Sequence, residues 1–185
     1  MSLLRKNYSK VTQTERSFFI RQGTTDGLID GDGSANVDGS VTPVNFYITP
    51  NAGDLMEVVE LSIELSDGGT PSIDEYGNIG SALTNGVQIF LERDGVATPL
   101  GLPIVDNRGL INLGPELTYI QLSGNERVVK ATFNIRDFAK NGVTLDSTTG
   151  DKLGIIIQDD LSTLIEHSVI MKGNVKIGNI DELVV

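Results

Sequence analysis

The chain is 185 residues long and acidic, with 25 Asp and Glu against 14 Lys and Arg and a formal net charge of −11 at pH 7. It has no cysteine, which excludes disulfides, a thiol nucleophile and a thiolate metal site. No apolar run approaches the roughly 18 residues that a membrane-spanning helix needs. Arg5-Lys6 directly after Leu3-Leu4 also breaks the apolar core of a signal peptide. We therefore expect a protein that is neither membrane-bound nor exported through a signal peptide.

The two parts of the chain carry opposite charge. Up to Thr24 there are five basic residues against one acid, a net charge of +4, whereas the rest has nine basic residues against 24 acids, a net charge of −15. Residues 23–42 are rich in Gly, Asp, Ser and Thr and hold too little apolar surface to form a core. We expect residues 1–42 to form an extended N-terminal arm with a spacer, and residues 43–185 to form a single domain.

In the domain, apolar side chains recur at every second position, which indicates β-strands with one buried face. The clearest strands are expected around Phe46 and Ile48, and then at residues 59–65, 87–91, 129–135, 153–157 and 169–177. Val59 should face inward with Leu61, and Ser168 should face outward. Asp94-Gly95 predicts a tight hairpin turn. Residues 102–106, 110–113 and 118–122 are shorter strand candidates.

Helical patterns are scarce, with one possible turn at residues 136–141 and a short capped segment at residues 159–165. About eight strands separated by turns, with no βαβ spacing, favour an antiparallel arrangement. Because the loops are long and uneven, the sequence predicts an all-β fold, an antiparallel β-sandwich that is jelly-roll-like and carries the extended arm.

The arm has basic and apolar side chains that could bind another protein. In Ser17–Arg21 the alternation places two apolar residues on one face, which is typical of a strand that adds to the edge of a neighbour's sheet. The acidic domain repels nucleic acid, so we expect docking on an acidic protein surface, with a solvated tail as the alternative. The expected contact residues are Arg5, Lys6, Lys10, Arg16, Phe18, Ile20 and Arg21.

The longest loop, Asp67–Thr84, contains turn-forming residues, acids and one tyrosine. It is either a solvent-exposed Ω-type loop or a contact loop in which Ile73 and Tyr76 insert into a partner while Asp67 and Asp74 meet basic residues. The sequence leaves both interpretations open.

The spacer resembles a calcium loop only superficially, because an EF-hand counted from Asp30 would need Gly and Glu where Ala35 and Val41 stand. We interpret its acids as part of a polar linker, and an irregular calcium site that forms on assembly is the alternative. These acids are Asp26, Asp30, Asp32 and Asp38. We expect no metal site and no cofactor.

No arrangement of residues indicates catalysis. His167 is the only histidine, no G-x-S-x-G motif is present, and no nucleophile can be paired with this histidine from spacing alone. The acid pairs Asp74-Glu75 and Asp159-Asp160 are expected by chance in so acidic a chain. We do not expect an enzyme.

Several segments resemble a family of tailed-bacteriophage virion structural proteins. The resemblance lies in Phe46–Gly53, Val58–Ile63, Asp67-Gly68, Tyr76–Asn78 and Leu83–Val87, about a quarter of the chain. It consists of strands and turns and contains no catalytic motif. Capsid decoration or cement proteins of this kind are often jelly rolls, and many are trimers whose terminal arms extend across neighbouring subunits.

The resemblance implies a structural protein located in the virion, assembled in the host cytoplasm, with the major capsid protein or other virion proteins as partners. A homo-oligomer is expected, with a trimer favoured by analogy. The expected function is head decoration through the arm and the long loops. The alternatives are a head-to-tail connector or tail component, and a receptor- or glycan-binding β-sandwich.

Overall fold

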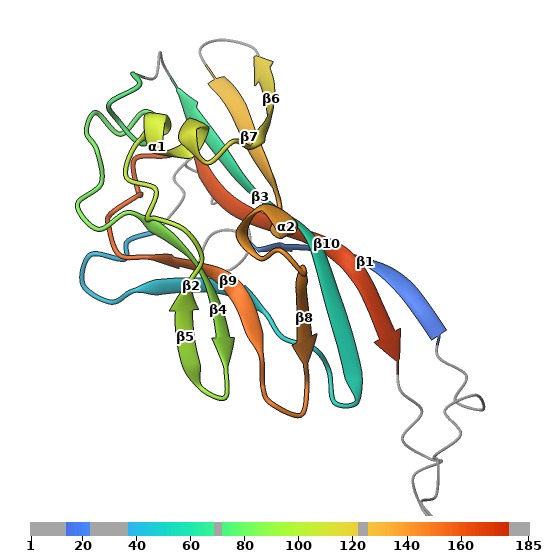
Figure 1. The fold of residues 1–185 in the computed structure, drawn as a ribbon. Coiled ribbons are helices and arrows are strands. Elements are labelled where there is room, and N and C mark those ends of the chain that lie inside the picture. The colour runs from blue at the N-terminus through green and yellow to red at the C-terminus, as the bar shows by residue number, and fades with distance from the viewer. Residues whose placement is uncertain (1–13, 23–36, 69–71, 122–125, 178–185) are drawn as a thin grey trace, which may run out of the picture.

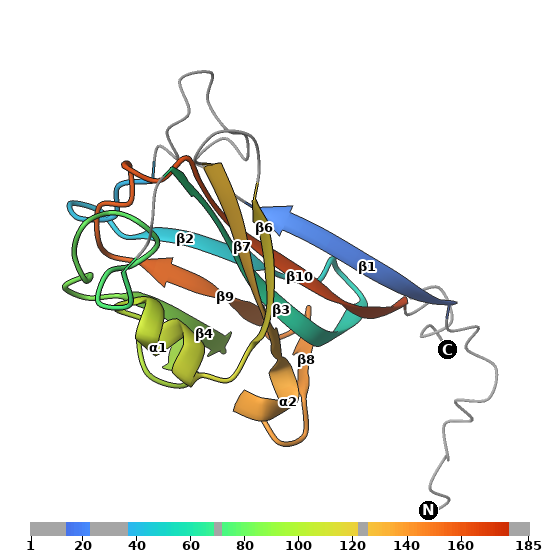
Figure 2. The ribbon, with the colours of Figure 1, turned by 90° about the horizontal axis from the view of Figure 1, so that it is seen from above.

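The computed structural model describes residues 14–22, 37–68, 72–121 and 126–177, which form two antiparallel sheets packed face to face (Figures 1 and 2). In order across the larger sheet lie β1 (Thr14–Gln22), β10 (Glu166–Ile177), β3 (Asp54–Gly68), β7 (Glu126–Asn134) and β6 (Glu116–Gln121), and β8 (Val143–Asp146) pairs with the start of β3. The smaller sheet has the order β2 (Val44–Ile48), β9 (Lys152–Ile157), β4 (Val87–Arg93) and β5 (Val96–Pro99). The predicted all-β sandwich is confirmed.

The core lies between the two sheets and is built from the alternation seen in the sequence. Ile63 of β3 and Phe133 of β7 meet Ile89 of β4 and Ile155 of β9 in one cluster of buried side chains. The expected hairpin also forms, because Arg93 pairs with Val96 and the left-handed backbone of Asp94 and Gly95 makes the two-residue turn.

The alternation of β3 is interrupted by a β-bulge. Lys172 of β10 pairs with Glu60 and the next residue, Gly173, pairs with Val58, so Val59 is the extra residue. Val58 is therefore buried and Val59 is 38% exposed. The expectation that Val59 faces the core is wrong, because the bulge moves the buried face from odd to even positions.

The first half of β10 is buried on both faces. His167 and Val169 lie on the core side, and Ser168 and Ile170 on the other side are also buried. The expectation that Ser168 faces solvent is therefore wrong. A strand next to the centre of a wide sheet can be covered on both sides, and alternation then no longer distinguishes its faces.

The N-terminal segment differs from the expected arm. β1 pairs with β10 of the same chain along its whole length, from Thr14 opposite Ile177 to Gln22 opposite Val169. Ser17–Arg21 therefore extends the sheet of its own chain and not that of a neighbour. Pairing within one chain avoids the entropy that two molecules lose when they associate. Residues assigned to the spacer also join the domain: Val37 is buried and the Gly39 amide donates to the carbonyl of Asp159.

Two helices occur in the described part of the chain, α1 (Asn107–Asn112) and α2 (Ile135–Phe138). The turn expected at residues 136–141 corresponds to α2. The strand expected at residues 110–113 is wrong, since α1 includes most of it, and residues 102–106 contribute only an isolated bridge from Ile104 to Val87. Residues 159–165 form turns instead of a helix. The Asp159 carboxylate accepts hydrogen bonds from the backbone amides of Thr84 and Gly86, so it does not cap a helix. In these described ranges, neither helix is long and apolar enough to cross a membrane.

Candidate protein-binding site

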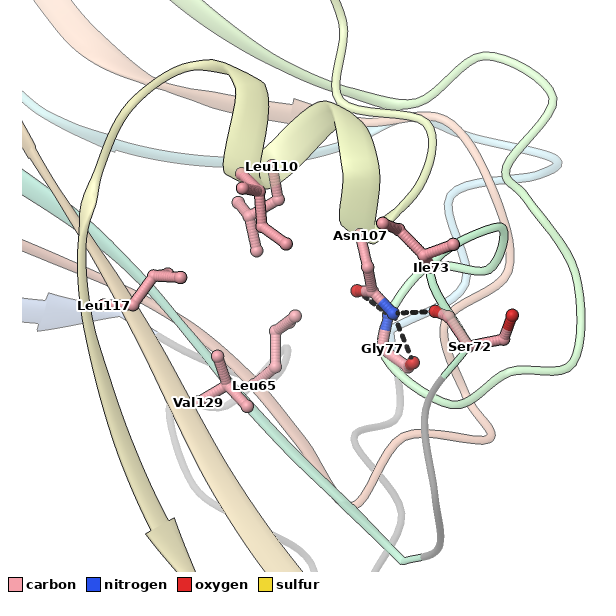
Figure 3. Close-up of a pocket in the computed structure, with 9 residues that line it drawn as sticks. Leu65, Ser72, Ile73, Gly77, Asn107, Leu110, Leu117 and Val129 are labelled. Atoms are coloured by element: carbon pink, nitrogen blue, oxygen red, sulfur yellow. Dashed lines mark hydrogen bonds between the residues drawn. The ribbon is translucent and has the colours of Figure 1, made fainter.

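A pocket opens where α1 lies over the end of the larger sheet. It has a volume of about 250 Å³. Figure 3 shows Leu110 of α1 directed toward Leu65, Leu117 and Val129, which come from β3, β6 and β7. We call this hollow the apolar pocket. Its lining residues are Leu65, Ser72, Ile73, Gly77, Asn107, Leu110, Ile111, Leu117 and Val129.

The roof of the apolar pocket is fixed by the start of α1. Asp106 caps the helix, its carboxylate accepting from the Gly109 amide at 2.5 Å, and Leu110 is buried beneath the helix. The Asn107 side chain donates to the carbonyls of Ser72 and Gly77, at 2.7 and 2.9 Å, and accepts from the Gly77 amide (Figure 3). One amide side chain therefore joins the helix to the loop that forms the pocket wall.

That loop, residues 72–80, is ordered by its own acids. The Glu75 carboxylate accepts from the backbone amides of Ser72 and Gly80 and is buried. Asp74 forms an exposed ion pair with Arg108 of α1, at 2.5 Å. The charged residues of the loop thus bind their own chain, whereas Ile73 remains 49% exposed at the pocket.

Tyr76 anchors the loop to the sheet and does not project from it. Its ring is fully buried, and its hydroxyl lies 2.8 Å from Nε2 of His167 on β10. The expectation that Tyr76 inserts into a partner is corrected by this position, because its aromatic surface is already used in the core of its own chain. Of the loop residues named from the sequence, Ile73 alone lines the apolar pocket with an exposed apolar side chain.

The buried pair is uncharged at neutral pH. Burial lowers the pKa of His167 from its ordinary value of 6.5 to about 3, and burial raises the pKa of Tyr76 above its ordinary value of 10. Nδ1 of His167 is buried and finds no hydrogen-bond partner among the residues that the structure describes. A neutral, enclosed tyrosine–histidine pair serves as a structural connection between the loop and β10.

Strand β6 forms the edge of the larger sheet beside the apolar pocket. Among the described strands it pairs with β7 alone, so its other side forms the edge of the sheet. Three of its apolar side chains are about half exposed: Leu117 (47%), Tyr119 (56%) and Ile120 (49%). An apolar edge strand of this kind is a template for another extended segment.

On the opposite face of β6 lies a polar hollow. Glu116 is next to Leu117 in the strand, so it faces away from the apolar pocket and lines this hollow with Glu60 and Asp137. Glu60 is paired with Lys172 at 3.3 Å. Glu116 and Asp137 form no ion pair with the described residues, and both are exposed. We call this second feature the acidic hollow.

The remaining predicted contact residues do not gather at this site. Arg5, Lys6 and Lys10 lie outside the described residues, as do Asp26, Asp30 and Asp32 of the spacer. Arg16, Phe18, Ile20 and Arg21 lie in β1, at the other edge of the larger sheet. Asp67 lies at the end of β3, opposite Arg127. Asp38 accepts hydrogen bonds from the amide and hydroxyl of Ser40, and the described residues contain no cluster of three metal-binding side chains.

Most residues of the site were not identified from the sequence. The sequence pattern places Leu110 and Leu117 only in short strand candidates or next to them, and it predicts no role for Asn107. The spacing of Asp106 and Gly109 does carry a helix-capping signal. The pocket itself has no local signal, because it joins segments that are distant in the chain.

Comparison with protein-family models, with curated protein sequences and with solved structures finds no match to this chain.

Proposed function

We propose that this chain is a non-enzymatic structural protein that binds another protein through the corner formed by α1, β6 and the loop at residues 72–80. The observation that carries the proposal is the apolar pocket beside β6, which is the edge strand of the larger sheet among the residues that the structure describes. A bound segment could pair with β6 and place one apolar side chain in the pocket, the usual arrangement of β-strand addition.

The resemblance to tailed-bacteriophage virion proteins supplies the biological setting of this proposal. In that setting the partner is a capsid or other virion protein, and decoration of the head is the role we favour, with a neck or tail position as the alternative. Binding of glycans is less well supported, because Tyr76, one of the few aromatic candidates, is buried and therefore closed to a sugar.

Site-specific photocrosslinking tests the proposal. A photoreactive amino acid at Leu117 should give a discrete crosslinked product in assembled particles from the source of the chain. The matched control is Val96, which is 66% exposed on the edge strand β5 of the other sheet. Equal crosslinking from both positions, or none from Leu117, would contradict binding at this corner.

A further inference from the structure

We infer that the segment bound at this corner is the N-terminal arm, residues 1–13, of a second copy of the chain. The inference rests on the proposed function and adds the identity of the partner.

The two faces of β6 suit different side chains, since one face borders the apolar pocket and the other borders the acidic hollow. Successive residues of a strand point to opposite faces, so a segment paired with β6 places one side chain over the apolar pocket and the next over the acidic hollow. The complementary dipeptide is an apolar residue followed or preceded by a basic one. Leu4-Arg5 in the arm has this pattern, and Lys10-Val11 has it in reverse order.

Charge favours the N-terminal arm over the other end of the chain. Residues 1–13 carry Arg5, Lys6 and Lys10 and no acid. Residues 178–185 include Asp181 and Glu182 and no base. Because the acidic hollow contains Glu116 and Asp137 without described ion pairs, it attracts the first segment and repels the second.

The distance from Thr14, where the arm ends, to Leu117 indicates that the bound arm belongs to another copy of the chain. Thr14 pairs with Ile177, which pairs with Asp54 at the start of β3, whereas Leu117 pairs with Ala131, which pairs with Ile63. Nine residues along β3 and four strand spacings across the sheet separate Thr14 from Leu117 by roughly 35 Å. Figure 1 shows β1 and β6 at opposite edges of the sheet.

The same chain could bring Leu4 to Leu117 only when fully taut. Ten residues span at most about 33–36 Å. A taut crossing leaves no slack to turn and run along β6, which strand pairing requires. We therefore place the arm on β6 of a neighbouring copy, an asymmetric contact that closes into a ring or continues as a chain.

Complementation between two full-length variants tests the inference. Leu4→Asp disables the arm, Leu117→Asp disables the pocket, and Val96→Asp is the control at an exposed apolar position on the other sheet. Self-association is measured over a concentration series by sedimentation velocity. The unmodified chain and the control should associate alike, and each disabled variant should associate roughly 30-fold more weakly, because one leucine is no longer buried.

A mixture of the two disabled variants should form dimers and nothing larger, since each pair keeps one intact arm and one intact pocket. In a second pair of variants, Arg5→Glu should weaken association, and adding Glu116→Arg should restore it. This pair does not disturb the pocket, so it remains informative if Leu117→Asp fails to fold, which circular dichroism would show.

The possible failures have different meanings. If Leu117→Asp weakens association and Leu4→Asp does not, the corner binds a protein but not this arm, so the inference falls and the proposed function stands. If Leu4→Asp alone weakens association, the arm binds elsewhere and the inference is also overturned. Absence of self-association in the unmodified chain, or an equal effect of Val96→Asp, overturns it as well.

Discussion

The hydroxyl of Tyr76 lies 2.8 Å from Nε2 of His167, which joins the long loop before β4 to the buried half of β10. The two residues are distant in the sequence, and both side chains are fully buried. This single contact holds one wall of the candidate site against the sheet.

Stability should fall as the solution is acidified from pH 6.5. Burial lowers the pKa of His167 to about 3 in the folded chain, whereas the unfolded histidine keeps the ordinary value of 6.5. Between these values the unfolded chain binds one more proton, so the free energy of unfolding decreases by about 1.4 kcal/mol for each pH unit below 6.5. Urea unfolding at pH 7.5, 6 and 5 measures this slope.

The histidine contribution is separated by His167→Gln, which should have a flatter profile over the same range. Asp38 and Asp146 also respond to acid, because hydrogen bonds from Ser40 and Thr148 lower their pKa below 3.8. Their stabilisation is present above 3.8 and is lost below it, so it does not produce the slope between pH 5 and 6.5. An identical slope in His167→Gln would contradict the prediction.

Replacing Tyr76 with Phe should destabilise the chain by about 1–3 kcal/mol, because Nε2 of His167 would stay buried without its partner. At about 2–4 °C per kcal/mol the melting temperature should fall measurably in calorimetry. Tyr47→Phe is the matched control, since Tyr47 is 39% exposed and its removal leaves no buried group unpaired. Equal losses in both variants would show that the pair contributes little.

Asp159 should be important for stability although it lies in a turn. Its carboxylate accepts from the backbone amides of Thr84, Asn85 and Gly86 at 2.8–3.3 Å. Asp159→Ala leaves these donors unpaired and should cost about 2–4 kcal/mol in chemical unfolding. The neighbouring Asp160→Ala, at an exposed position, should cost much less. A similar loss in both would contradict the role of the carboxylate.

Gly154 should not tolerate a side chain. It pairs with Tyr47 on one side and with Phe90 on the other, and an added Cβ would lie 2.1 Å from the carbonyl oxygen of Phe46. Gly154→Ala must displace the backbone of β2, so we expect a loss of about 1–3 kcal/mol in thermal unfolding. Asn45→Ala, at an exposed position of β2, is the control. Unchanged stability in Gly154→Ala would contradict the prediction, because it would show that β2 can shift away from the added methyl group without loss of stability.

Alternation of apolar residues was sufficient to predict most strands, because Ile89, Phe133 and Ile155 each bury one face of a strand. It could not locate the bulge at Val59, since Val58 and Val59 are both apolar and either could face the core. It also could not predict that β1 pairs with β10, because the sequence of an edge strand does not say which chain supplies the adjacent edge.

The site was less predictable than the fold for a physical reason. Ile73 was named from the sequence because it stands in a long loop, but its neighbours in the pocket come from β3, α1, β6 and β7. Tyr76 looked like a contact residue because tyrosine is common at interfaces. Only the three-dimensional position of His167 shows that Tyr76 is used internally.

The pairing of Thr14 with Ile177 has a mechanical consequence. The two residues lie side by side at one end of the β1–β10 ladder, so forces that pull them apart act on one pair of hydrogen bonds at a time. The hydrogen bonds of the ladder would break one after another from that end, because the force never acts on all of them at once. A force applied between Thr14 and Ile177 would therefore release β1 at low force.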